Sequence, residues 1–269
     1  MDGVLIPFAW GSGEENMARD QHMAMVAGRR SSAALRVYGW KEPTLSLGHF
    51  QQETDIPDRL KRIAQIRRPT GGGAIVHHRE VTYALAIPVD PARNVKGEES
   101  RLYAVVHEAV ERGLRKLGWP ARQAGESSGT QPNGTAHPFL CFERRYPVDL
   151  VLGESKILGS AQRRLSSCVL QHGSLLLAKS DQLTPHLEGV CDFPERLPVE
   201  QSESVAWGLP ESTWDDAMTT EANMLAGWGA WMAWVIQVAI SESLKMKWSE
   251  ASALDWLEMD SGNSSIRGS

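Results

Sequence analysis

Hydrophobic residues recur at helical spacing in two separate parts of the first half of the chain. The clearer part is residues 101–117, where apolar side chains follow the i, i+3, i+4 pattern of a helix that buries one face, and Gly118 marks its end. The periodic residues are Leu102, Val105, Val106, Ala109, Val110 and Leu114. Residues 14–26 (EENMARDQHMAMV) are more loosely periodic, and they also predict a helix.

Short apolar runs bounded by turn residues predict strands in the rest of the first two thirds of the chain. These runs are residues 34–38, 43–48, 74–76, 81–88, 148–152, 156–160 and 168–177. Gly153 and Glu154 separate two of the runs and predict a hairpin. A long polar segment, residues 125–138, precedes that hairpin and is rich in turn residues, so we expect a long loop there.

The C-terminal third has a different pattern. From Trp214 to Met259 the chain predicts mainly helix and is rich in tryptophan. Trp228, Trp231 and Trp234 partly share one helical face, and we expect them to pack on a sheet rather than to form a partner surface. We expect residues 1–259 to form a single catalytic domain and residues 260–269 to form a disordered tail.

Composition excludes several classes of protein. The net charge of −5 argues against a general nucleic-acid binder, and the absence of a run of 18 apolar residues predicts no membrane span. The first ten residues lack the basic region of a signal peptide. Three widely spaced cysteines fit a reducing cytoplasm better than a disulfide framework, and no CxxC or His/Cys cluster suggests a metal site. We therefore expect a cytoplasmic protein without a bound metal.

The most informative motif is residues 67–78 (RRPTGGGAIVHH). Three consecutive glycines are costly to order, so a fold holds them rigid mainly where the backbone must approach something closely. The motif is not a phosphate-binding P-loop, which needs Lys and then Ser or Thr after the last glycine, and it lacks the dinucleotide fingerprint G-x-G-x-x-G. It leads into a strand instead of a helix.

Two residues in the middle of the chain could carry chemistry. Cys141 follows the long polar loop and precedes Arg144 and Arg145, which could favour a reactive thiolate, although a cysteine between apolar residues is more often a core residue. Lys156 lies near a run of small residues, 159–161, through which a ligand could approach closely. Its ammonium group could stabilise an oxyanion there, but a lysine at a hairpin is commonly a solvated surface residue.

The histidines give weaker indications. His172 interrupts an otherwise apolar strand, where it could be a general base or a hydrogen-bonded structural residue. His77 and His78 are adjacent in a strand, so their side chains point to opposite faces and cannot easily bind one metal ion.

Several of these motifs together resemble the lipoate/octanoate branch of the biotin/lipoate ligase and transferase superfamily. The matching segments are residues 15–18 (ENMA), 43–48 (PTLSLG), 67–74 (RRPTGGGA), 82–83 (TY), 156–164 (KILGSAQRR) and 170–174 (LQHGS). Their order and spacing match over roughly residues 14–180. The resemblance implies an α+β fold with mixed, largely antiparallel sheets and flanking helices.

Within that family, the chain is most similar to the cysteine-dependent octanoyltransferases, because Cys141 lies fifteen positions before Lys156. The resemblance implies transfer of an octanoyl or lipoyl group from acyl carrier protein, through a thioester on Cys141, to a lysine of a lipoyl domain. The acceptor would be the glycine cleavage H protein or a 2-oxoacid dehydrogenase E2 component. No cofactor is implied, because the acyl group arrives activated.

The resemblance also assigns roles to individual residues. It makes Cys141 and Lys156 catalytic, with Lys156 contacting the acyl carbonyl and stabilising the tetrahedral intermediate. It makes the following residues substrate-binding: Arg68, Gly71, Gly72, Gly73, His77, Gly159, Ser160, Ala161 and His172. Three alternatives stay open: an ATP-dependent lipoate-protein ligase, an amidotransferase that moves octanoyl groups between lipoyl domains, and a non-catalytic lipoyl-domain binder.

Overall fold

The computed structural model describes residues 2–89, 98–125, 138–187, 189 and 221–250. In this part of the chain, eight strands form one large mixed sheet in the order β11-β1-β2-β6-β10-β9-β8-β7. The strands are β1 (Asp2–Gly11), β2 (Ala33–Trp40), β6 (Glu80–Pro88), β7 (Arg122–Gln123), β8 (Leu150–Leu152), β9 (Ser155–Arg164), β10 (Cys168–Leu176) and β11 (Lys247–Glu250). β11, β1 and β2 run parallel, and the other neighbouring pairs are antiparallel.

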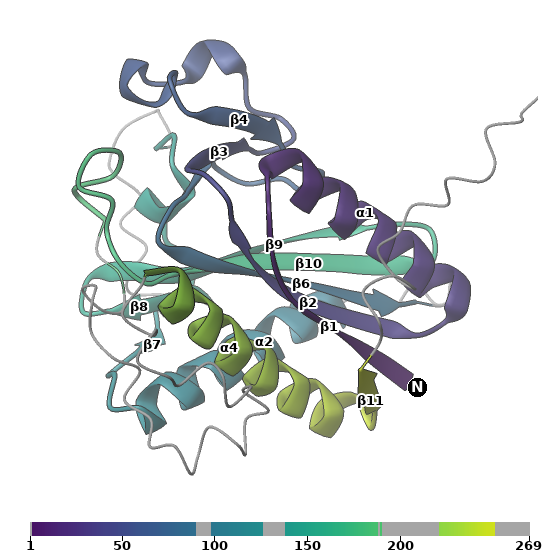
Figure 1. Ribbon diagram of the computed structural model, residues 1–269. Helices are drawn as coiled ribbons and strands as arrows, with labels where there is room; N and C mark the ends of the chain where they lie inside the picture. Colours follow the sequence, from purple (N-terminus) through teal and green to yellow (C-terminus); the bar gives the residue numbers. More distant parts are fainter. Residues whose placement is uncertain (1, 90–97, 126–137, 188, 190–220, 251–269) are drawn as a thin grey trace, which may run out of the picture.

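A second, three-stranded sheet lies beside one end of the large one (Figure 1). It consists of β4 (Ala64–Arg67), β3 (Thr44–Leu47) and β5 (Ile75–His77), with β3 parallel to β4 and antiparallel to β5. The glycine motif connects β4 to β5. This small sheet therefore fixes both ends of the glycine loop.

Helices cover both faces of the large sheet (Figure 1). On one face lies α1 (Gly13–Arg30), and on the other lie α2 (Glu98–Lys116) and α4 (Glu221–Leu244). Helix α1 starts with a capping box, in which Ser12 Oγ accepts from the backbone N–H of Glu15 and the Glu15 carboxylate accepts from the backbone N–H of Ser12. The expected fold class, α+β with mixed and largely antiparallel sheets, is confirmed.

The predicted helices and strands lie close to their expected positions. Periodic residues of α2, such as Val106 and Val110, are fully buried against the sheet together with Trp228 and Trp231 of α4. This confirms the expected packing of the tryptophans. The sequence interpretation missed β1, β4 and β7, and it was wrong at residues 247–250, which form β11 instead of continuing a helix. The predicted tail, and most of the predicted loop 125–138, lie outside the described residues.

Helix α4 has an unusual composition for a surface helix. Its segment Met224–Leu244 is long and apolar enough to cross a membrane, but 67% of that window is buried inside the protein. Trp228, Trp231 and Ile236 lie in the main hydrophobic core with side chains of α2 and the sheet. We therefore interpret α4 as a core helix.

Candidate active site

A cavity of about 580 Å³ lies between the large sheet and the glycine loop. All eleven residues that the sequence nominated line it: Arg68, Gly71, Gly72, Gly73, His77, Cys141, Lys156, Gly159, Ser160, Ala161 and His172. They come from the glycine loop, a short 3₁₀ helix and three strands, and they span more than 100 positions of the chain. Cavities of this size commonly hold small organic ligands.

Cys141 and Lys156 lie next to each other in this cavity. The Lys156 Nζ atom is 3.6 Å from Cys141 Sγ and 2.7 Å from a carboxylate oxygen of Asp149. Lys156 and Asp149 are both almost fully buried. Burial disfavours the charged form of Lys156, but Cys141 and Asp149 outweigh it, so the pKa of Lys156 lies above its ordinary value. The buried ammonium group can therefore stabilise negative charge on the cysteine sulfur.

A β-bulge directs Lys156 into the cavity. Leu150 of β8 pairs with Leu158 of β9, but Val151 pairs with Lys156, so β9 contains one extra residue at this point. The bulge places Lys156 on the same side as Gly159, and a Cβ atom at position 159 would lie 2.7 Å from Lys156 Nζ. Any side chain at position 159 would therefore displace the lysine ammonium from its observed position.

The glycine loop holds the cysteine in place through the main chain. The Cys141 N–H donates to Ala74 O over 2.7 Å, and the Ala74 N–H donates to Phe139 O over 3.0 Å. A Cβ atom at Gly73 would lie 3.0 Å from the Cys141 nitrogen. Cys141 begins the 3₁₀ helix Cys141–Glu143. The absence of a side chain at position 73 thus lets this helix pack directly on the loop.

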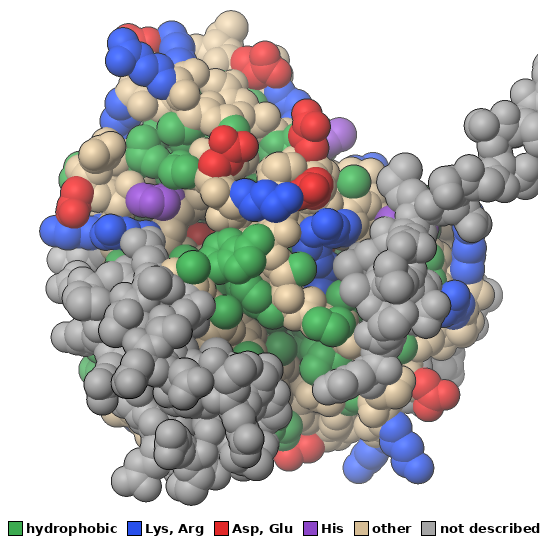
Figure 2. Space-filling model, in the orientation of Figure 1, with side chains coloured by type: hydrophobic (Ala, Val, Ile, Leu, Met, Phe, Trp, Pro, Cys, Tyr) green, Lys and Arg blue, Asp and Glu red, His purple; other side chains and the backbone are tan. Residues whose placement is uncertain are grey.

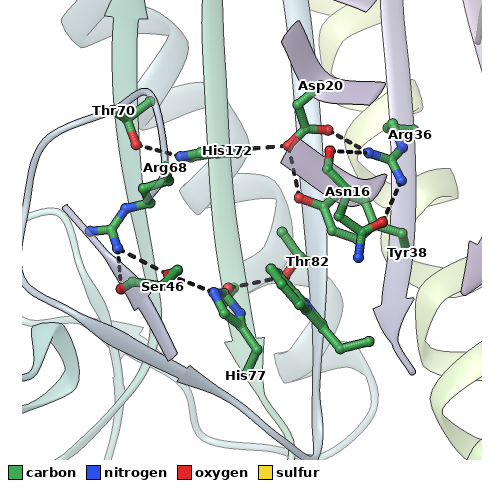
Figure 3. Close-up of polar contacts among 12 residues, drawn as sticks. Asn16, Asp20, Arg36, Tyr38, Ser46, Arg68, Thr70, His77, Thr82 and His172 are labelled. Carbon is green, nitrogen blue, oxygen red and sulfur yellow. Dashed lines mark hydrogen bonds and ion pairs between the residues drawn. The ribbon is translucent and has the colours of Figure 1, made fainter. Parts of the chain in front are cut away.

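Arg68 stabilises the same loop from inside. Arg68 is 3% exposed, and its guanidinium donates to Ser46 O and Oγ (Figure 3). It also donates to Gly71 O and to Gly73 O. Burial lowers the pKa of Arg68 to about 10, which leaves it charged at neutral pH. Arg68 therefore lines the cavity and also fixes the backbone of the glycine loop.

His77 belongs to a chain of hydrogen bonds in the cavity wall (Figure 3). Its Nε2 atom lies 2.7 Å from Ser46 Oγ, its Nδ1 atom lies 2.8 Å from the carboxylate of Glu80, and its ring stacks on Trp40. Burial lowers the pKa of His77 despite the opposing effect of Glu80, which favours a neutral ring. Because Arg68 donates to Ser46, the Ser46 hydroxyl is oriented to donate to His77.

His172 connects the glycine loop to helix α1 (Figure 3). Its Nε2 atom lies 2.5 Å from Thr70 Oγ1, and its Nδ1 atom lies 3.6 Å from a carboxylate oxygen of Asp20. Asp20 is fully buried and pairs with Arg36 at 2.6 Å. Burial opposes ionisation of Asp20, but Arg36 and His172 outweigh it, so the pKa of Asp20 lies below its ordinary value. The contact between His172 and Thr70 therefore helps to position the glycine loop.

Ser160 has both of its hydrogen-bonding functions occupied. Its hydroxyl lies 2.7 Å from Tyr83 and 2.7 Å from Nε2 of His107, whose Nδ1 atom lies 2.6 Å from Val148 O. Burial lowers the pKa of His107 to about 4, so the ring is neutral and donates through Nδ1. Nε2 then accepts the Ser160 proton. Ser160 therefore contributes surface to the cavity, but its hydroxyl proton is not available to a ligand.

The sequence interpretation missed Asp149. It included this residue in a predicted strand and gave it no role, although a single carboxylate within Val148-Asp149-Leu150 is unusual in an apolar run. This isolated carboxylate was the feature of the sequence that could have indicated a functional role for Asp149. The partners in the networks carried no comparable signal. Ser46 meets His77 through the pairing of β3 with β5, and Thr70 meets His172, which is 102 positions away in the sequence.

No group of three His, Cys, Asp or Glu side chains that could hold a metal ion occurs among the residues that the structure describes. Cys168, the other described cysteine, is buried, and burial raises its pKa to about 12. At pH 8 only about one in 10⁴ of its thiol groups is then ionised.

We therefore expect a thiol-alkylating reagent at pH 8 to modify Cys141 and to spare Cys168 in the folded protein. Peptide-resolved mass spectrometry in a Cys191→Ser background measures the two sites separately. Denatured protein, in which both cysteines react, is the control. Equal labelling of the two sites in the folded state would contradict the burial of Cys168.

The fold and this arrangement agree with one known family. The lipoyl protein ligase A/B catalytic domain family matches residues 12–197, and the chain belongs to this family. Octanoyltransferase LipM of Kyrpidia tusciae is 39% identical over 174 residues, which are 62% of this chain and 63% of that protein. Octanoyltransferase LipM of Symbiobacterium thermophilum is 36% identical over 197 residues, which are 70% of this chain and 69% of that protein. The chain thus aligns with roughly two thirds of the length of these relatives.

Solved structures show the same fold. A putative lipoate protein ligase from T. acidophilum with bound lipoic acid superposes with a TM-score of 0.61 at 21% identity, covering 94% of this chain and 90% of that one. A lipoate-protein ligase A bound with ATP superposes with a TM-score of 0.60 at 20% identity, covering 94% and 89%. At 20–21% identity, these two solved structures establish the fold but not the reaction.

Proposed function

We propose that this protein is a cysteine-dependent octanoyltransferase. It takes an octanoyl group from acyl carrier protein and passes it, through a thioester on Cys141, to a lysine of a lipoyl domain in the cytoplasm. The observation that supports this most directly is the Cys141 sulfur 3.6 Å from the buried Lys156 ammonium, at a cavity of about 580 Å³. The similarity to octanoyltransferases supports the same acyl group.

The first half-reaction exchanges one thioester for another. The Cys141 thiolate attacks the carbonyl carbon of the carrier-bound octanoyl group, a carbon–sulfur bond to Cys141 forms, and the bond to the carrier thiol breaks. Lys156 gives its proton to the departing carrier thiolate. The products are octanoyl-Cys141, the carrier thiol and a neutral Lys156, so no ATP is consumed.

The second half-reaction returns the enzyme to its starting state. The amine of the acceptor lysine attacks the octanoyl-Cys141 carbonyl, an amide bond forms and the carbon–sulfur bond breaks. The neutral Lys156 accepts the proton that the amine loses. Acylation of Cys141 removes the negative charge that raises the pKa of Lys156, so the lysine is a better proton acceptor in this step.

The partners must bind through local contacts, because the whole chain carries a net charge of −5. Figure 2 shows Lys/Arg and Asp/Glu side chains interspersed around the upper part of the visible face, so that face has no field of a single sign. We propose the acceptors to be the lipoyl domains of the glycine cleavage H protein or of 2-oxoacid dehydrogenase E2 components.

Octanoyl-acyl carrier protein and an apo-lipoyl domain, mixed with the purified protein in the absence of ATP, should yield octanoylated lipoyl domain. Mass spectrometry of the lipoyl domain measures the product, and free octanoate with ATP is the comparison. Transfer only from free octanoate with ATP would replace the proposal with a ligase. Transfer only from an octanoylated lipoyl domain would identify an amidotransferase, and no turnover with any donor would leave a lipoyl-domain binder.

A further inference from the structure

Both half-reactions pass through a tetrahedral intermediate whose oxygen carries negative charge, and this oxygen needs a hydrogen-bond donor. Lys156 transfers a proton in each step, so it cannot hold the oxyanion through the same proton. In many thiol enzymes a backbone N–H at the nucleophile could serve, but the N–H of Cys141 donates to Ala74 O at 2.7 Å. The cavity therefore requires another donor.

The Tyr103 side chain offers a hydroxyl group at the cavity that holds Cys141 and Lys156. It projects from α2, and it lines the cavity together with Cys141 and Lys156. The strand β8 ends its pairing with β9 where Leu150 meets Leu158, so Ser160 lies just beyond the last pair. Tyr103 approaches β9 there, and the backbone of Ser160 lies close enough to its phenol oxygen to affect its ionisation. The phenol proton can donate to an acyl oxygen in the cavity.

The position of Tyr103 is fixed by its neighbours. Its ring packs on the His107 ring with centroids 4.8 Å apart. His107 is itself held between Val148 O and the Ser160 hydroxyl. Burial raises the pKa of Tyr103 far above its ordinary value, and the nearby Tyr83, Asp149 and Cys141 raise it further. The phenol consequently keeps its proton at every pH at which the enzyme would work.

We propose that Tyr103 is a further catalytic residue, whose hydroxyl donates a hydrogen bond to the acyl oxygen in the thioester and in both tetrahedral intermediates. The phenol proton stays on Tyr103 throughout, so the proton balance of the two half-reactions is unchanged. Lys156 is then free to act as acid in the first step and as base in the second. This inference rests on the proposed function, because it assigns the donor for that reaction.

The test is Tyr103→Phe, which keeps the ring on His107 and removes only the hydroxyl. Loss of one oxyanion donor should lower kcat by about 10²–10³-fold. KM for a small octanoyl thioester should change little, and the thermal unfolding temperature should stay close to that of the wild type. A purely structural role would instead lower the unfolding temperature together with the activity.

A spectroscopic measurement tests the contact directly. Octanoyl-Cys141 carrying ¹³C at the carbonyl is prepared without acceptor in wild type and in Tyr103→Phe, and its carbonyl stretch is recorded by infrared difference spectroscopy. The band should lie at higher frequency in Tyr103→Phe, because a hydrogen bond to the carbonyl oxygen is lost. If the band is unmoved and kcat stays within about threefold of wild type, the inference is overturned. If wild type itself forms no octanoyl-Cys141, it is the proposed function that fails.

Discussion

Replacing Cys141 by alanine should abolish octanoyl transfer, with a loss of at least roughly 10³-fold, because the thioester that divides the reaction into two steps cannot form. Wild-type protein incubated with octanoyl-acyl carrier protein should gain the mass of one octanoyl group. The adduct should be removed by hydroxylamine and should be absent from Cys141→Ala. Intact-protein mass spectrometry measures the adduct, and the octanoylated lipoyl domain measures the complete reaction.

Cys168→Ala is the matched control for this experiment. Cys168 lies in the core between α1 and the sheet and is 1% exposed, so its loss should affect stability more than transfer. It should leave the octanoyl adduct intact. Undiminished transfer by Cys141→Ala would rule out the covalent mechanism and would favour ATP-dependent activation of the free acid.

Replacing Lys156 by methionine should lower transfer by about 10²–10⁴-fold, the usual contribution of a positioned acid or base. It should also destabilise the fold by about 3–5 kcal/mol, because it leaves the Asp149 carboxylate buried without its partner at 2.7 Å. Activity assays and urea unfolding measure the two effects separately. The sequence alone suggested a solvated lysine as one alternative, and the structure shows it buried.

The double variant Lys156→Met/Asp149→Asn separates chemistry from folding. An uncharged amide at position 149 can still accept the N–H of Tyr146, and no buried charge is left unpaired. Most of the lost stability should return while transfer remains low. If the double variant recovers transfer as well, Lys156 acts only by balancing the charge of Asp149, and its role as proton donor and acceptor is wrong.

The sequence predicted much of this site because its motifs have local causes. The triple glycine indicated a close approach of main chains, and in the structure a Cβ atom at Gly73 would lie only 3.0 Å from the Cys141 nitrogen. The periodic apolar residues of 101–117 predicted α2, since burial of one helical face is encoded at a fixed spacing. The small residues near Lys156 predicted access to a ligand, and they do line the cavity.

The features that the sequence did not predict depend on contacts between distant segments. β1 contains Pro7 and a register irregularity between Ile6 and Ala9, so its pattern does not alternate cleanly. β11 is four residues long and follows directly on a helix, and it is a strand only because β1 offers it a partner. Likewise, Asp149 pairs with Lys156, and Tyr103 reaches the cavity from α2. No local pattern places either residue near Cys141.

The pairing of β11 with β1 has a consequence for how this domain can be divided. The family match ends at residue 197, but β11 covers the outer edge of β1, and Trp248 lies so close to Gly3 that a Cβ atom there would meet its ring at 2.8 Å. A chain that ended at residue 197 would lack β11, which would leave that edge of β1 with unpaired backbone groups, and it would also lack α4, which is part of the core. Open edges of this kind recruit strands from other molecules. The C-terminal segment thus covers the edge of the sheet, and the folded structure extends beyond the region that the family matches.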